Sequence, residues 1–149
     1  MTEFSNIPSK SPTNHTENTH NRCIVHVCTS CRSVHTQDKL LRKQAGSILY
    51  QQLRDALNTT HLQNRVEIRP AECLSVCPRP CGIALSSSGA WTYLFGDQQP
   101  NETVHDIIKC ISLYLDSSDG FMSRNERPIS LQRSILGRIP PIRGVKKCT

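Results

Sequence analysis

The 149-residue sequence is poor in apolar and aromatic residues and contains no long hydrophobic run. Hydrophobic residues make up 36% of the chain and aromatic residues 5%, which indicates that part of the chain lies outside a folded core. No apolar run approaches the roughly 18 residues of a membrane-spanning helix, so we expect no membrane association. The residues after Met1 lack the basic and apolar regions of a secretory signal, and we therefore expect a cytoplasmic protein.

Patterns typical of enzymes and of nucleic-acid-binding proteins are also missing. We find no nucleophile–base–orienter set and no phosphate-binding glycine loop, so we expect a binding or carrier protein and no enzyme. The net charge is +6, but residues 1–119 hold equal numbers of basic and acidic residues, so the excess lies in residues 120–149. Those basic residues alternate with Ile, Leu and Pro and form no nucleic-acid-binding motif. We expect an acidic protein partner instead.

The composition divides the chain into three parts. Residues 1–21 are polar and are expected to be disordered. Residues 22–119 are expected to form one α/β domain. Residues 120–149 are expected to form a basic, proline-containing C-terminal extension that packs partly on that domain and presents a partner surface.

Apolar periodicity predicts the order β-α-β-β-β-α within the domain. The predicted elements are a strand at 23–27, a helix at 38–57, a strand at 65–69, a hairpin of strands at 82–85 and 91–95, and a helix that follows Asn101 and stops near Gly120. Thr36 and Asn101 are the predicted N-caps, and Pro70 is expected to end the second strand. Gly46, inside the first helix, predicts close packing on the sheet.

Five of the eight cysteines form two runs, Cys28-x2-Cys31 and Cys73-x3-Cys77-x3-Cys81. Packing gives thiols no reason to recur at regular spacing, and in a reducing compartment such runs are typical of metal ligands or redox groups. The other thiols have ordinary interpretations. Cys23 should face the core, Cys110 should be half-buried on a helix, and Cys148 should be free in the tail.

The predicted topology joins the two runs into one site. A helix between two strands implies a parallel pair, whose strands both end at the same edge of the sheet. Cys28 and Cys31 follow the first strand, and the three-cysteine run follows the second. We therefore expect all five thiols at one edge.

Four interpretations of these thiols are open. They are an iron–sulfur cluster, structural zinc, a dithiol redox pair at Cys28 and Cys31, and cysteines that bind nothing. The wider spacing of the 73–81 run counts against a zinc ribbon. A dithiol pair would leave the other three thiols unexplained, and packing alone would leave the regular spacing unexplained.

Several stretches resemble known families. Val27-Cys28-Thr29-x-Cys31, the helix and strand after it, and Glu72-Cys73-Leu74-x-x-Cys77 resemble the thioredoxin-like [2Fe-2S] ferredoxins. The same cysteines, with Trp91, Tyr93 and the Arg-Pro pieces up to residue 142, resemble a bacterial family of predicted metal-binding proteins of unknown function, some of them found among genes of cobalamin metabolism.

These resemblances imply a thioredoxin-like fold and a cysteine-ligated [2Fe-2S] electron carrier. The implied ligands are Cys28, Cys31, Cys73 and Cys77, and Cys81 can replace a member of the first pair. The implied partner is a redox or metal-handling protein. A zinc- or cobalt-binding module in metal handling and a thiol-disulfide oxidoreductase are the alternatives.

Overall fold

Nine elements make up the part of the chain that the computed structural model describes, which is residues 21–33, 36–142 and 144. In chain order they are β1 (Cys23–Cys28), α1 (Lys39–Asn58), β2 (Val66–Ala71), β3 (Ile83–Ser86), β4 (Thr92–Phe95), α2 (Val104–Asp116), a 3-10 turn (Arg124–Glu126), α3 (Ile129–Arg133) and β5 (Ile135–Ile139). The predicted order β-α-β-β-β-α is confirmed and is followed by a further helix and strand. The expected disorder of residues 1–21 falls almost entirely outside the described residues.

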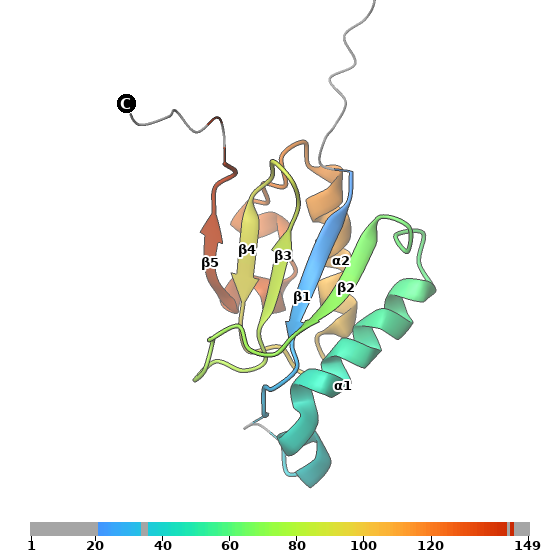
Figure 1. The fold of residues 1–149 in the computed structure, drawn as a ribbon, viewed down its shortest axis with the longest axis vertical. Helices are drawn as coiled ribbons and strands as arrows, with labels where there is room; N and C mark the ends of the chain where they lie inside the picture. The colour runs from blue at the N-terminus through green and yellow to red at the C-terminus, as the bar shows by residue number, and fades with distance from the viewer. Residues whose placement is uncertain (1–20, 34–35, 143, 145–149) are drawn as a thin grey trace, which may run out of the picture.

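The five strands form one mixed sheet in the order β2-β1-β3-β4-β5 (Figure 1). β1 and β2 are parallel, and every other neighbouring pair is antiparallel. Alternate residues of β1, namely Cys23, Val25 and Val27, are buried, as a strand with one face on the core requires. α1 contacts β1, β2 and α2, and the buried face of α1 includes Leu49 and Leu53. No helix in the described ranges combines the length and apolar character needed to cross a membrane.

The first helix begins later than the cap prediction implied. Its N-cap is Asp38, whose carboxylate accepts hydrogen bonds from the backbone N–H groups of Leu40 at 2.8 Å and Leu41 at 3.2 Å. Thr36 instead accepts from the Asp38 N–H at 3.2 Å, so the Thr36 prediction is wrong. The first turn of a helix has backbone N–H groups without a partner inside the helix. The Asp38 carboxylate, and not the Thr36 hydroxyl, accepts from two of these groups.

Pro70 does not end the second strand. β2 runs through Pro70 to Ala71, and Pro70 is paired in register with Val27 of β1. β2 is an edge strand, and an edge strand tolerates proline because one of its sides has no ladder to complete.

The cap prediction for the second helix is also wrong. The N-cap of α2 is Thr103, two residues after Asn101. The side chain of Asn101 accepts a hydrogen bond from Gln52 of α1 at 2.6 Å, and its backbone N–H donates to the same side chain at 2.8 Å. This long-range pairing uses Asn101 to fasten the loop to α1. α2 ends at Asp116, and Gly120 lies beyond it at φ 75, where a Cβ would lie 2.6 Å from the Tyr114 ring.

Residues 120–142 are part of the folded domain and contribute α3 and β5 to it. β5 pairs with β4, with Leu94 opposite Gly137 and Phe95 opposite Ile135, and so completes the sheet. Leu131 of α3 is fully buried, and Met122 before it is 1% exposed. The expected packing of this segment is therefore present, but its apolar residues belong to the same core as residues 22–119, and only residues after 139 lie beyond the last element.

Candidate metal centre

The ends of β1 and β2 meet at one edge of the sheet, as the predicted parallel pairing requires. Cys28, the last residue of β1, is in register with Ala71, the last residue of β2. The backbone N–H of Thr29 donates to the carbonyl of Ala71 at 2.8 Å, and the Cys28 N–H donates to Gly82 at 3.0 Å. The Cys28 sulfur lies 3.8 Å from the carbonyl oxygen of Glu72, the residue before Cys73. The expected convergence of the two cysteine runs is thus confirmed at the level of the backbone.

Three of the five thiols are buried together. Cys28 and Cys31 are each 2% exposed, and Cys81 is fully buried. The Cys31 thiol donates a hydrogen bond to Cys81, and this bond, followed by burial, raises the pKa of Cys31. The same hydrogen bond lowers the pKa of Cys81, against the effect of burial. Because the proton stays on Cys31, Cys81 is the member of this pair that ionises first.

Cys73 and Cys77 differ from the buried three because both are exposed on the 72–80 loop. The Cys73 sulfur accepts a hydrogen bond from the Ser75 N–H at 3.2 Å. All seven cysteines in the described ranges are free thiols. Among those same residues, no three Cys, His, Asp or Glu side chains are arranged to hold a metal ion as they stand. The predicted ligands therefore share one edge without forming a finished coordination sphere.

Two glycines bring backbone close to the cysteines. The Gly46 N–H of α1 donates to the carbonyl of Cys31 at 3.1 Å, and a Cβ on Gly46 would lie 2.1 Å from the carbonyl oxygen of Cys28. This confirms the close packing predicted for Gly46. A Cβ on Gly82, beside Cys81, would lie 2.4 Å from a methyl carbon of Val76. Helix α1 therefore packs directly on the backbone of Cys28, and the absence of a side chain at Gly82 leaves room for Val76 of the 72–82 loop.

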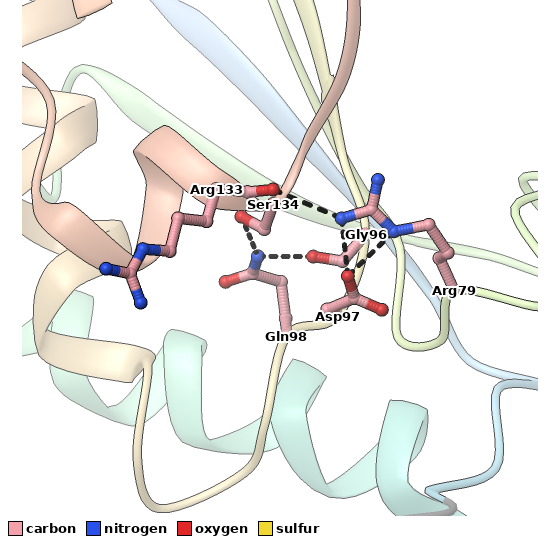
Figure 2. A network of polar contacts seen from close by, with 6 residues as sticks. All are labelled: Arg79, Gly96, Asp97, Gln98, Arg133 and Ser134. Atoms are coloured by element: carbon pink, nitrogen blue, oxygen red, sulfur yellow. Dashed lines mark hydrogen bonds and ion pairs between the residues drawn. The ribbon is translucent and has the colours of Figure 1, made fainter.

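A polar network holds the segment around Cys81, and Figure 2 shows its members Arg79, Asp97 and Gln98. Arg79 pairs with Asp97 at 2.6 and 2.8 Å and donates to the carbonyl of Arg133 at 3.2 Å. The backbones of Cys81 and Gln98 exchange two hydrogen bonds, at 3.1 and 3.3 Å. The buried Gln98 side chain donates to Gly96 at 2.7 Å and to the Ser134 hydroxyl at 2.9 Å. The loop between Cys77 and Cys81 is therefore tied to the segment before β5.

Sequence reasoning did not identify Asp97, Gln98 or Ser134 as residues that support the site. They lie at least 16 positions after Cys81, and nothing in their local pattern distinguishes them from ordinary loop residues. Arg69 and Arg79 lie close to the second cysteine run in sequence, and both are paired with carboxylates, Arg69 with Glu67 and Arg79 with Asp97. Their charges are therefore partly neutralised by partners other than the cysteines.

The remaining thiols belong to the core or to undescribed residues. Cys23 is 2% exposed, as predicted, and burial raises its pKa to about 12. Cys110 is also 2% exposed, so the prediction of a half-buried thiol is wrong. The Cys110 sulfur lies 3.7 Å from the sulfur of Met122, which belongs to the segment expected to be an extension. Burial raises the pKa of Cys110 to about 12. Cys148 lies outside the described residues.

The surface beside the first cysteine run is basic. A hollow of about 540 Å³ is lined by Arg32, Ser33, Lys39, Arg42 and Lys43. Arg32 follows Cys31 directly, and the Ser33 N–H donates to the carbonyl of Arg42 at 3.1 Å, which holds this loop against α1. Positive charge of this kind attracts acidic surfaces and stabilises nearby thiolates.

The donor chemistry fits a soft metal or an iron–sulfur cluster. Two cysteine runs follow the ends of β1 and β2, three of their five thiols are shielded from water, and such centres are held by four thiolates. A set of four requires at least one exposed thiol from the 72–80 loop to join the buried three. Cys73 and Cys77 are the available groups.

Comparison with known proteins gives one family and one fold. A family model described as "Protein of unknown function (DUF1636)" matches residues 25–141. Comparison with curated proteins gives no match. A thioredoxin-like [2Fe-2S] ferredoxin from Aquifex aeolicus superposes with a TM-score of 0.53 at 16% sequence identity, covering 81% of this chain and 96% of the ferredoxin. A cysteine-to-serine variant of that ferredoxin gives a TM-score of 0.50 at 17% identity, covering 77% and 98%. The predicted α/β, thioredoxin-like ferredoxin fold is confirmed, and at this identity the likeness shows the fold alone.

Proposed function

We propose that this chain, which belongs to the DUF1636 family of proteins of unknown function, binds a metal centre through cysteine thiolates, and that this centre is a [2Fe-2S] cluster. The observation that carries the proposal is the parallel register of β1 and β2, which brings Cys28-x2-Cys31 and Cys73-x3-Cys77-x3-Cys81 to one edge. The likeness of the fold to a ferredoxin supports the choice of cluster. The protein would act as a carrier and not as an enzyme.

The proposed ligands are four of the five clustered thiols. Cys28 and Cys31 come from the end of β1, and Cys73 and Cys77 come from the exposed loop. Cys81 is the alternative to either member of the first pair, because it is buried against Cys31 and hydrogen-bonded to it. When bound, the cluster would accept and return one electron. The protein would position the ligands in two ways. Helix α1 packs on the backbone of Cys28, and the hydrogen bonds of Arg79 and Gln98 hold the 77–81 segment, which limits how far the thiols can separate.

Zinc is the second candidate, because four thiolates also suit a tetrahedral zinc site. Cobalt bound for delivery would use the same thiols. A thiol-disulfide oxidoreductase is disfavoured by burial. Cys28 and Cys31 are each 2% exposed, and an attacking thiolate has to reach the substrate disulfide.

We propose an acidic redox or metal-handling protein as the partner. The basic hollow lined by Arg32, Lys39, Arg42 and Lys43 lies beside the first cysteine run and offers a surface of complementary charge. Small carriers that dock by charge bind weakly and dissociate as salt is raised. Binding that persists unchanged at high salt would contradict docking by charge.

The test is a series of single substitutions with metal content as the readout. Cys28→Ser, Cys31→Ser, Cys73→Ser and Cys77→Ser should each lose the metal, whereas Cys23→Ala and Cys110→Ala, which change buried thiols away from the site, should keep it. Loss in Cys81→Ser with retention in Cys31→Ser would place Cys81 in the ligand set. Equal metal content in all variants would refute the thiolate centre.

A further inference from the structure

A second candidate site lies beside β5, the outermost strand on the side of the sheet away from β2. A pocket of about 400 Å³ is lined by Phe121, three arginines and the first residues of β5. The arginines are Arg124, the first residue of the 3-10 turn, Arg127, which directly follows the turn, and Arg138 of β5. The cysteines follow β1 and β2, which are separated from β5 by β3 and β4. This pocket is therefore distinct from the candidate metal centre.

Arg127 is the unusual member of the three. It is 6% exposed, and its Nε has no hydrogen-bond partner. One terminal nitrogen lies 3.5 Å from the carbonyl of Leu131, and the guanidinium lies 6.0 Å from the centre of the Tyr93 ring. Buried arginines are normally paired with an anion, because an unpaired buried charge is costly. A buried guanidinium with an unused donor, and with no anionic partner among the described residues, points to an anion supplied by a ligand.

Within the described part of the chain, Arg124 and Arg138 form no ion pair with a carboxylate either. Arg138 packs over the rings of Trp91 and Phe121, at 5.2 and 4.8 Å from their centres. The two ion pairs formed within the described ranges are Arg69–Glu67 and Arg79–Asp97, and neither involves this pocket. Glu126, between Arg124 and Arg127, accepts a hydrogen bond from the Ser123 N–H at 2.7 Å, which engages its carboxylate with the turn. Among the described residues, three positive charges therefore line one pocket and none of them is paired with a carboxylate.

We propose that this pocket binds the phosphate group of a small phosphate ester. The planar guanidinium matches phosphate with two parallel hydrogen bonds, and three arginines suit a dianion better than a single carboxylate. Phe121, which is 40% exposed, lies with Ile135 and Leu136 along the same pocket and offers an apolar surface to the organic part of the ester. Trp91 packs against Phe121 with ring centres 5.6 Å apart, and it is the only tryptophan in the sequence.

The test titrates the full chain with inorganic phosphate and with phenyl phosphate at constant ionic strength, adjusted with sodium chloride. Trp91 fluorescence and calorimetry should both show saturable binding, tighter for phenyl phosphate. Arg124→Ala and Arg138→Ala change exposed residues, so both variants should fold, and each should weaken binding by about tenfold or more by calorimetry. Arg127 is left unchanged because it is part of the core.

Arg133→Ala is the matched control. It removes the same charge from the same segment but does not line the pocket, so its affinity should equal that of the unchanged protein. Cys28→Ser should also bind phosphate normally, which separates this site from the metal centre. Absence of saturable binding, equal weakening in Arg133→Ala, or unchanged binding in both Arg124→Ala and Arg138→Ala would each overturn the proposal.

Discussion

The contact between Gly46 and Cys28 gives the sharpest test of how α1 is held against the site. Gly46→Ala should raise the helical propensity of α1 by about 1 kcal/mol. The added Cβ, however, would lie 2.1 Å from the carbonyl oxygen of Cys28 and 3.1 Å from two backbone carbons. The obstacle is backbone, so no side chain can turn away, and overpacking of this kind costs about 1–3 kcal/mol or more. The 2.1 Å approach puts the cost at the upper end of this range, so after the gain in helical propensity we expect a net loss of about 2 kcal/mol in the free energy of unfolding.

Urea denaturation of the full chain measures this loss, and metal content should fall in the same variant because Cys28 is displaced. Gly137→Ala is the control, since a Cβ there would meet nothing within 4 Å and its stability should match that of the unchanged protein or exceed it slightly. A Gly46→Ala protein as stable as the Gly137→Ala control would refute the close approach of α1 to Cys28.

Two further predictions concern the network and the buried thiols. Asp97→Asn breaks a partly exposed ion pair and should lower stability by less than about 1 kcal/mol, yet Cys81 should react faster with a thiol reagent. Glu67→Gln, in the other ion pair, should leave that rate unchanged, and an unchanged rate in Asp97→Asn would contradict the network's role. Burial raises the pKa values of Cys23 and Cys110 from 9.0 to about 12. Between these two pH values, both thiols stay protonated in the folded protein but ionise in the unfolded chain. The stability that they contribute is fully present below about pH 9 and is lost as the pH rises toward about 12. Cys110→Ala should therefore make the free energy of unfolding fall less steeply with pH in this alkaline range. An unchanged slope would argue against a protonated Cys110 in the folded protein.

The parallel pairing of β1 and β2 could be predicted because a strand–helix–strand order has one common solution, and that pairing alone placed both cysteine runs at one edge. The division into buried and exposed thiols could not be predicted. It depends on Gln98, which exchanges backbone hydrogen bonds with Cys81, and on Arg79, which is held by Asp97.

The other errors have the same origin in long-range contacts. Asn101 is a good helix cap locally, but Gln52 of α1 occupies its side chain. The segment that forms β5, Ile135–Ile139, is short and contains Gly137 and Arg138, and nothing in the sequence indicates that it pairs with the strand predicted at 91–95. β4 is its partner, and Cys110 becomes fully buried because Met122, from the same 120–142 part of the chain, covers it.

The proposed cluster is tested by measuring iron and acid-labile sulfide in the full chain, purified without oxygen. We predict a brown-red protein that contains equal amounts of iron and sulfide, two of each per chain, as a [2Fe-2S] cluster requires. A colourless protein with zinc in place of iron would show that the thiols hold a different metal. A protein that retains no metal at all under these conditions would contradict the proposed centre itself.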